Sequence, residues 1–251
     1  MINKGHKVAV LTVDPSSSIS KGSILGDKTR MENLSREPNC FIRPSPAGTT
    51  LGGVTSKSRE TITICEAAGY DVILIETVGV GQNEITVRSM VDFFLLLMIS
   101  GAGDELQGIK RGVVEIADAL LINKADGENK SRAEIAKTEY STALHYLQPK
   151  IEGWSTPVET CSAISNQGIE EFWSLVLDFV TLTKKTGYFE GNRTEQSKKW
   201  FYSLIDEKLK SLFFNDSQIK ENLPKFEKDI LNNELFILDA VERLFSNYKK
   251  R

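Results

Sequence analysis

The stretch that most constrains the fold of this chain is residues 72–82, which read V-I-L-I-E-T-V-G-V-G-Q. Four apolar, mostly β-branched residues predict a strand buried on both faces, as in a parallel sheet. Polar residues begin where this strand ends, at the edge where open α/β sheets hold their ligands. Glu76 is therefore a candidate to hold Mg²⁺ through a water, and the N–H of Gly79 to meet a phosphate. An ordinary strand followed by a glycine turn is the alternative.

Composition excludes several classes of protein. The 251 residues are 40% hydrophobic, which is enough for a full core, and the net charge of -3 gives no reason to expect nucleic acid as a partner. The cysteines at positions 40, 65 and 161 are far apart and indicate reduced thiols rather than a disulfide framework or a zinc site. With two histidines, a histidine metal site or a Ser-His-Asp triad is disfavoured. Residues 93–99 are the most apolar run and have the length of a strand, so we expect a cytoplasmic protein without a membrane partner.

A second predicted strand, residues 7–13, ends at Asp14 and is followed by Pro15 and three serines. An acidic side chain at the end of a strand can lie beside the Mg²⁺ ion that accompanies a bound nucleotide. Asp and Ser also make helix N-caps and Asx turns routinely, so both interpretations of Asp14 stay open.

Two polar segments rich in Gly and Pro, residues 22–30 and 43–53, flank a weak helix. Long irregular segments in a compact α/β domain are usually functional loops. Asp27 and Arg30 are therefore candidates for contact with phosphates or a partner, and a solvated surface loop is the competing interpretation.

Residues 93–99 predict another strand, which is followed by G-A-G-D-E and then by helical spacing over residues 106–117. Asp104 and Lys110 bracket the start of that helix. The positive end of a helix dipole favours anions at such a place.

The sharpest chemistry follows the predicted strand 119–122, where the chain reads Asn123-Lys124-Ala125-Asp126. An Asp carboxylate can accept two parallel hydrogen bonds from the N1–H and the exocyclic amine of guanine. Adenine lacks that pair of donors and would leave a buried acid unpaired. Asn123 can tie the loop to its neighbours, and the stem of Lys124 can cover one face of the base.

The last predicted strand leads from Trp154 into Thr160-Cys161-Ser162-Ala163-Ile164. Small residues at a strand end let a backbone N–H approach the guanine carbonyl oxygen. Ser162 can also be the N-cap of a helix over residues 168–182, and both roles can hold at once.

The composition changes after residue 183, which divides the chain into predicted domains 1–183 and 184–251. Residues 184–193 form a polar, Gly-containing linker in this interpretation. Three amphipathic helices follow, at residues 194–214, 219–230 and 234–248. Their apolar surface predicts docking on the main domain or on a second copy.

Five strand-plus-helix units with polar motifs at every strand end imply an α/β fold, a doubly wound and mostly parallel sheet. Motifs for magnesium, the γ-phosphate and guanine, in this order, imply a GTPase that binds GTP or GDP with Mg²⁺.

The chain resembles the methylmalonyl-CoA mutase-associated GTPases, the MeaB/ArgK-like metallochaperones, over nearly its whole length. The resemblance rests on the following blocks: V-D-P-S-S at 13–17, S-I-L-G-D-K-T-R at 23–30, R-P-S-P at 43–46, L-G-G-V at 51–54, C-E-A-A-G-Y-D-V at 65–72, E-T-V-G-V-G-Q at 76–82, G-A-G-D-E-L-Q-G-I-K at 101–110 and N-K-A-D at 123–126.

This resemblance implies roles for individual residues. Asp14 and Glu76 would lie beside the Mg²⁺ ion, and Gly79 would contact the γ-phosphate. The first mobile segment would contain Asp27 and Arg30, and a switch loop that couples nucleotide state to the mutase would contain Asp104 and Lys110. The guanine site would comprise Asn123, Lys124, Asp126, Ser162, Ala163 and Ile164.

The resemblance also implies a P-loop GTPase fold, with the C-terminal helices as a homodimerisation arm. The partner would be methylmalonyl-CoA mutase or a related adenosylcobalamin-dependent mutase. The GTPase would gate the loading of adenosylcobalamin and protect the mutase from inactivation, while the cobalamin belongs to the partner.

The sequence departs from the family in one part, because no G-x-x-x-x-G-K-[ST] loop is present. Lys57-Ser58 comes closest, but Gly52-Gly53 lies too far upstream. In the family that loop precedes the position of Lys7, so the pattern is typical of an N-terminally truncated form with half a nucleotide site and negligible hydrolysis. The alternatives are a non-catalytic, dimerising interaction module and an ATP-using relative, and Asp126 argues against the latter.

Overall fold

The computed structural model describes residues 1–14, 31–46, 51–77, 83–101 and 112–249. The chain forms two compact units, Met1–Ser197 and Lys198–Arg251. Five candidate residues from the sequence lie outside the described residues, namely Asp27, Arg30, Gly79, Asp104 and Lys110. The prediction that 1–183 and 184–251 are separate functional domains stays a prediction.

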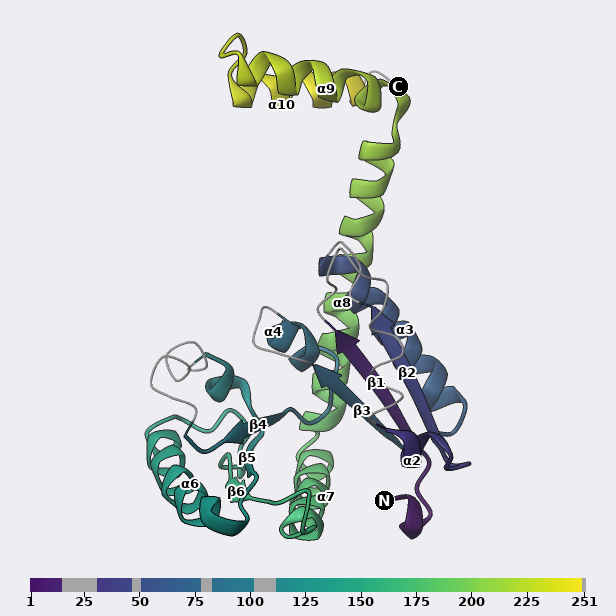
Figure 1. Cartoon of the computed structure of the whole chain (residues 1–251). Helices are drawn as coiled ribbons and strands as arrows, with labels where there is room; N and C mark the ends of the chain where they lie inside the picture. Colours follow the sequence, from purple (N-terminus) through teal and green to yellow (C-terminus); the bar gives the residue numbers. More distant parts are fainter. Residues whose placement is uncertain (15–30, 47–50, 78–82, 102–111, 250–251) are drawn as a thin grey trace. The chain divides into compact units, whose positions relative to one another are not determined.

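The first unit alternates strands and helices along the chain (Figure 1). Its described elements are η1 (Ile2–Lys4), β1 (Val8–Asp14), α2 (Glu32–Ser35), β2 (Cys40–Pro46), α3 (Leu51–Ala67), β3 (Val72–Thr77), α4 (Asn83–Arg88), β4 (Leu95–Ile99), β5 (Ala119–Asn123), η2 (Gly127–Asn129), α6 (Lys130–His145), β6 (Val158–Thr160), α7 (Ile169–Lys185) and the start of α8 (Tyr188–Asn215). Residues 112–116 are also helical.

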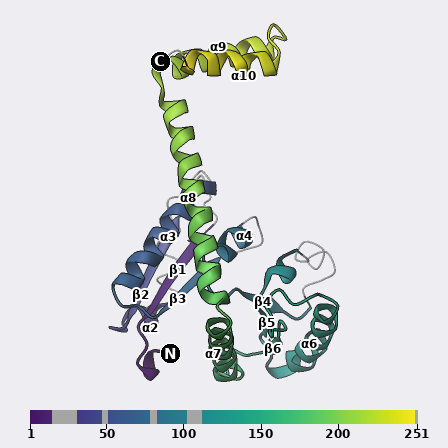
Figure 2. The same cartoon turned by 180° about the vertical axis from the view of Figure 1, so that it is seen from behind.

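The described strands form two three-stranded sheets in the orders β2-β1-β3 and β4-β5-β6. Every pair is parallel. Helix α3 contacts β1 and β2, and α6 contacts β5 and β6 (Figures 1 and 2). The predicted α/β class with parallel strands is therefore confirmed. A single hydrogen-bonded sheet was expected, and the difference arises because β3 and β4 do not pair with each other.

Apolar packing links the two sheets, although among the described residues no strand of one sheet pairs with a strand of the other. The largest cluster of buried residues includes Met98 of β4 and Leu120 and Ile122 of β5. Ile75 of β3 packs against this cluster and also against the smaller cluster of Ala9, Leu11 and Cys65. The side chain of Ile75 thus belongs to the cores of both sheets.

Strand β3 differs from its sequence prediction in one respect. The run V-I-L-I predicted burial on both faces, yet Leu74 is 42% exposed, whereas Ala9 of the neighbouring β1 is fully buried. Strand β1 has a hydrogen-bonded neighbour on each side, and β3 has one only on the β1 side among the described residues. The exposure of Leu74 follows from this edge position.

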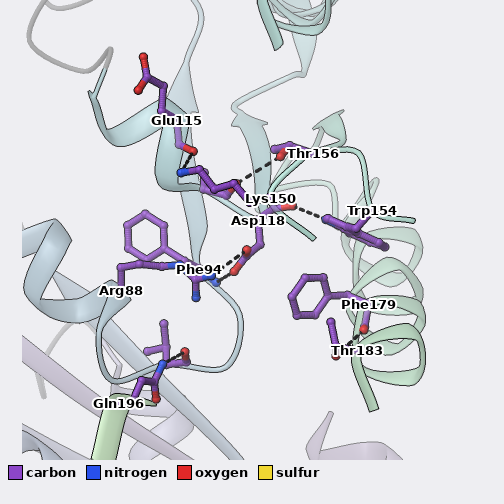
Figure 3. A network of polar contacts seen from close by, with 12 residues as sticks. Arg88, Phe94, Glu115, Asp118, Lys150, Trp154, Thr156, Phe179, Thr183 and Gln196 are labelled. Atoms are coloured by element: carbon purple, nitrogen blue, oxygen red, sulfur yellow. Dashed lines mark hydrogen bonds and ion pairs between the residues drawn. The ribbon is translucent and has the colours of Figure 1, made fainter. Parts of the chain in front are cut away.

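Asp118, just before β5, joins three parts of the first unit (Figure 3). Its carboxylate accepts hydrogen bonds from Arg88 Nη2 at 3.1 Å and from the N–H of Phe94 at 2.7 Å. Its backbone carbonyl accepts a hydrogen bond from Trp154 Nε1 at 2.9 Å. Burial raises the pKa of Asp118, and the positive charge of Arg88 opposes this shift. The carboxylate therefore fixes the end of α4 and the residues before β4 to the start of β5.

The second unit contains the rest of α8 together with α9 (Ser217–Leu231) and α10 (Ile237–Lys249). Asp216 caps α9 by accepting hydrogen bonds from the N–H groups of Gln218 and Ile219. The rings of Phe213 and Phe245 stack with centroids 4.7 Å apart. The three predicted helices are thus confirmed. No helix among the described residues has the length and apolar character needed to cross a membrane.

The predicted linker over residues 184–193 is largely helical. Helix α7 continues to Lys185 and α8 already begins at Tyr188. Arg193 explains the difference, because its guanidinium makes two hydrogen bonds to the carboxylate of Asp92 and lies 3.0 Å from Glu66. Ion pairs between a polar helix and residues far away in the sequence cannot be recognised from the local sequence of the helix.

Substitutions at Asp118 test its role in the first unit. Asp118→Ala leaves the Arg88 guanidinium and the Phe94 N–H without their partner, so we expect a loss of about 3–5 kcal/mol in the free energy of unfolding. Asp118→Asn keeps one of the two acceptor oxygens but places an NH2 group against the other donor, so we expect a smaller loss of roughly 1–3 kcal/mol. Urea unfolding of both variants measures the difference, and equal losses would contradict this account.

Candidate functional site

The site is built on the end of β5. Residues 119–122 are almost fully buried, and β5 pairs with β4 on one side and β6 on the other. A run of small and branched apolar residues suits a strand buried on both faces. Because both neighbours fix its register, the position of Asn123 at the carboxyl end of β5 is also fixed.

The side chain of Asn123 holds two loops together. Its Oδ1 accepts a hydrogen bond from the N–H of Lys124 at 2.7 Å. The N–H of Ala163 lies 3.4 Å from the same oxygen, and the Sγ of Cys161 lies 3.6 Å from it. Burial raises the pKa of Cys161, so its thiol stays neutral and can donate. Asn123 thus connects the N-K-A-D loop with the loop after β6.

Backbone hydrogen bonds continue this connection beyond the strands. The N–H of Cys161 donates to the carbonyl of Ile122, and the N–H of Ala125 donates to the carbonyl of Cys161, each at 2.9 Å. Ala125 and Cys161 are both buried. The two loops therefore leave the sheet side by side.

Ser162 holds the carboxylate of Asp126. Its hydroxyl, which is fully buried, donates to Oδ2 of Asp126 and accepts a hydrogen bond from the N–H of Ser165 at 3.1 Å. Asp126 is the N-cap residue of η2, but its side chain makes no capping hydrogen bond. Among the described residues, no group donates to Oδ1 of Asp126. The carboxylate is oriented by Ser162 while its other oxygen remains able to accept.

Two residues that the sequence did not single out shape the same loop. Asn129 donates from Nδ2 to the carbonyl of Lys124 at 2.7 Å, and its Oδ1 accepts a hydrogen bond from the hydroxyl of Ser100 at 2.8 Å. Lys124 has a φ of 61°, which costs a non-glycine residue about 1 kcal/mol. The hydrogen bond from Asn129 helps to hold that conformation and leaves the Lys124 side chain exposed.

Gly168 was also not foreseen, and it allows the loop after β6 to close. Its φ is 75°, and a Cβ at this position would lie 2.3 Å from the carbonyl oxygen of Thr160. Gly168, rather than Ser162, is the N-cap residue of α7. The helix-cap alternative for Ser162 therefore does not hold. Ala163 and Ile164 lie between these residues with exposed side chains, and Ile164 is 87% exposed.

The magnesium-side candidates lie at the ends of neighbouring strands in the other sheet. Asp14 is the last residue of β1, and Glu76 precedes the last residue of β3, where it pairs in register with Thr12. Glu76 is exposed, and the side chain of Asp14 lies outside the described residues. No group of three His, Cys, Asp or Glu side chains suited to a metal occurs in the described part of the chain.

Comparison with known proteins gives the family. The sequence profile of the methylmalonyl Co-A mutase-associated GTPase MeaB matches residues 1–218. The chain belongs to this family. The family is one of GTPases by its name, and the relatives carry such names. The chain is 48% identical to "GTPase ArgK" of Escherichia coli over 86% of its length and 66% of that protein. It is 45% identical to a "Putative GTPase" of Caulobacter vibrioides over 99% of its length and 76% of that protein.

A eukaryotic relative and a solved structure agree with this assignment. "Methylmalonic aciduria type A homolog, mitochondrial" of Mus musculus is 45% identical over the whole chain and 60% of its own length. The crystal structure of an LAO/AO transport system kinase superposes with a TM-score of 0.72 at 36% identity and covers all of this chain and 74% of its own. The chain thus spans between 60% and 76% of the MeaB-family relatives and structure named here.

Gly168 gives a direct test of the loop geometry in this MeaB-family chain. Gly168→Ala places a methyl group against a backbone carbonyl and strains φ, so we expect a loss of about 2–4 kcal/mol in the free energy of unfolding. Gly187→Ala is the matched control, because φ there is 74° and a Cβ would meet nothing within 4 Å. Its expected loss is about 1 kcal/mol. Similar urea midpoints for the two variants would show that the contact with Thr160 does not matter.

Proposed function

We propose that this chain binds the guanine base of GTP or GDP with Asn123, Lys124 and Asp126 and with the loop 162–164. The hydrogen bond from Ser162 to the Asp126 carboxylate carries the proposal. It orients an acid at the end of a buried parallel strand, where open α/β sheets bind nucleotides.

The chemistry of the base fits this acid. Guanine presents N1–H and an exocyclic amine side by side, and the Asp126 carboxylate would accept both. Because Ser162 already orients the carboxylate, little conformational freedom is lost on binding. The stem of Lys124 would cover one face of the base, and the N–H groups of Ala163 and Ile164 would approach the guanine carbonyl oxygen.

In this proposal the phosphates and Mg²⁺ are bound by residues of the other sheet and by loops. Asp14 and Glu76 would hold Mg²⁺, and Gly79 would contact the γ-phosphate. The remaining candidates are Asp27 and Arg30, on the phosphate side, and Asp104 and Lys110, in a loop that responds to nucleotide state. When bound, Mg²⁺ would neutralise phosphate charge. Since the 251 residues contain no G-x-x-x-x-G-K-[ST], we expect this polypeptide alone to bind nucleotide mainly through the base and to show no measurable turnover.

Exchanging the acid tests guanine recognition. Asp126→Asn exchanges two acceptors for an acceptor and a donor, so we expect GDP binding to weaken roughly 30- to 100-fold, or about 2–3 kcal/mol. Xanthosine diphosphate, which presents a carbonyl in place of the amine, should bind the variant better than GDP. Ligand-observed NMR can compare both nucleotides.

Glu128→Gln is the control for this experiment, because Glu128 is exposed in the same turn and the change alters the net charge equally. Equal binding of GDP by Asp126→Asn and the unsubstituted chain would rule out the proposed base site. ATP binding that matches GTP binding in the unsubstituted chain would point to the ATP-using alternative.

For the biological role, we propose a cytoplasmic chaperone of methylmalonyl-CoA mutase or a related adenosylcobalamin-dependent mutase. The support is the family, whose name states the association with the mutase. In this proposal the nucleotide state of the chain gates the loading of adenosylcobalamin and protects the mutase. The cobalamin itself stays on the mutase.

The second unit would form a homodimer. Its helices carry many large apolar side chains that are at least one-third exposed, including Phe201, Leu209, Leu212, Ile237 and Leu238. Exposed apolar surface of this extent is typical of an interface. A sedimentation-equilibrium mass of one chain would contradict the dimer.

Mutase binding separates the two candidate functions. For a nucleotide-responsive chaperone, surface plasmon resonance should show a dissociation constant for immobilised mutase that changes at least about fivefold with GDP, or about 1 kcal/mol of coupling. For a non-catalytic interaction module, binding should be unchanged by GDP. Asp126→Asn should abolish the GDP effect while leaving nucleotide-free binding intact.

A further inference from the structure

Each of the two strands beside β5 is followed by a serine whose hydroxyl is part of a hydrogen-bond connection to the N-K-A-D loop. On the β6 side, the hydroxyl of Ser162 donates to the carboxylate of Asp126. On the β4 side, the hydroxyl of Ser100 donates to Oδ1 of Asn129 at 2.8 Å, and Nδ2 of Asn129 donates to the carbonyl of Lys124 at 2.7 Å. The proposed guanine site uses the first connection directly and gives the second no role of its own.

The register of the sheet explains why Ser100 reaches this loop. Strands β4 and β5 are parallel, and Ile99 pairs with Asn123. Ser100 follows Ile99 and Lys124 follows Asn123, so the two chains leave the sheet next to each other. Asn129, the last residue of η2, connects them through its side chain. The connection between β4 and the loop therefore follows from the pairing of the strands.

The helix that Asn129 begins does not use its side chain. Asn129 is the N-cap residue of α6, a position where Asn commonly accepts a hydrogen bond from an N–H group of the first turn. Here φ is -82° and ψ is -10°, and the side chain makes no capping hydrogen bond. Both of its polar atoms are bonded to Ser100 and Lys124 instead. The side chain of Asn129 therefore orders the loop rather than α6.

The backbone that Asn129 holds is one that needs support. Lys124 has a φ of 61°, in the left-handed region that costs a non-glycine residue about 1 kcal/mol. Its N–H donates to Oδ1 of Asn123 at 2.7 Å, and its carbonyl accepts from Asn129. Because hydrogen bonds hold both polar groups of Lys124, the direction in which its exposed side chain leaves the loop is fixed. A stem that covers one face of a base requires such a fixed direction.

We propose that Asn129 and Ser100 are positioning residues for guanine-nucleotide binding and that they act through Lys124. Asn129 orients the backbone of Lys124, and Ser100 orients the amide of Asn129 so that its NH2 group faces that carbonyl. Recognition is then divided between the two sides of β5. Ser162 positions the carboxylate that binds the edge of the base, and Asn129 positions the stem that covers its face. This inference rests on the proposed guanine site.

Two nucleotides distinguish the edge of the base from its face. Inosine diphosphate lacks the exocyclic amine of GDP, so the dissociation constant of inosine diphosphate divided by that of GDP reports the second hydrogen bond to Asp126. Asn129→Ala should weaken the binding of both nucleotides by the same factor, at least about fivefold, and leave this ratio unchanged. Ser162→Ala should lower the ratio, because the carboxylate of Asp126 loses its orientation. Ligand-observed NMR on the full chain measures both dissociation constants.

A double-mutant cycle tests whether Asn129 acts through Lys124. In the Lys124→Ala background no stem remains to be positioned, so Asn129→Ala should change GDP binding by less than about twofold. Ser100→Ala alone should weaken the binding of both nucleotides by about twofold, again at a constant ratio. Asn215→Ala is the matched control, because Nδ2 of Asn215 also bonds to a serine hydroxyl, that of Ser211 on α8. It should leave GDP binding unchanged.

Three results would overturn the proposal. They are unchanged GDP binding by Asn129→Ala, a fall in the nucleotide ratio in that variant, and losses that simply add when it is combined with Lys124→Ala. If Asp126→Asn still weakens GDP binding in the same series, the guanine site stands and only the role of Asn129 is wrong. Equal GDP binding by Asp126→Asn and the unsubstituted chain would remove the guanine site itself, and this inference with it.

Discussion

The pairing of β5 with a parallel strand on each side is the constraint on which the candidate site depends. Asp118 fixes the start of β5 through Phe94, Arg88 and Trp154, and Asn123 ends it. A shift of one residue in a strand turns every side chain to the opposite face. Such a shift would separate Asn123 from the loop after β6. The buried carboxylate of Asp118 at one end of β5 therefore helps to keep Asn123, at the other end, in place.

The need of buried polar groups for hydrogen-bond partners explains both the stability of the loop and the proposed selectivity for a base. Ser162 is fully buried, and its hydroxyl would lose its acceptor without Asp126. A bound base that could not donate to Asp126 would leave a desolvated acid unpaired, which costs roughly 1–3 kcal/mol or more. The interaction that orders the loop in the free chain is therefore also the one that would reject adenine.

The sequence predicted the parts that local pattern determines. A buried run followed by N-K-A-D located the end of β5, and amphipathic spacing located α8, α9 and α10. Asn129, Ser100 and Gly168 were missed, because their roles depend on hydrogen bonds and close contacts that the folded chain alone brings together. The exposure of Leu74 was missed for a related reason, since a strand's sequence records its apolar character but not the number of its neighbours.

The polar segment after α7 shows how charge can give a linker-like sequence a fixed structure. Arg193 pairs with Asp92 and Glu66, and these carboxylates raise its pKa above the usual value for arginine. Gln196 donates to the carbonyl of Val91 at 2.9 Å. Residues 91 and 92 lie between α4 and β4, and α4 follows the glycine-containing residues 78–82. The first turns of α8 are therefore attached to the segment that leads away from the candidate phosphate side. Two side chains thus hold these turns in place where the sequence predicted a linker.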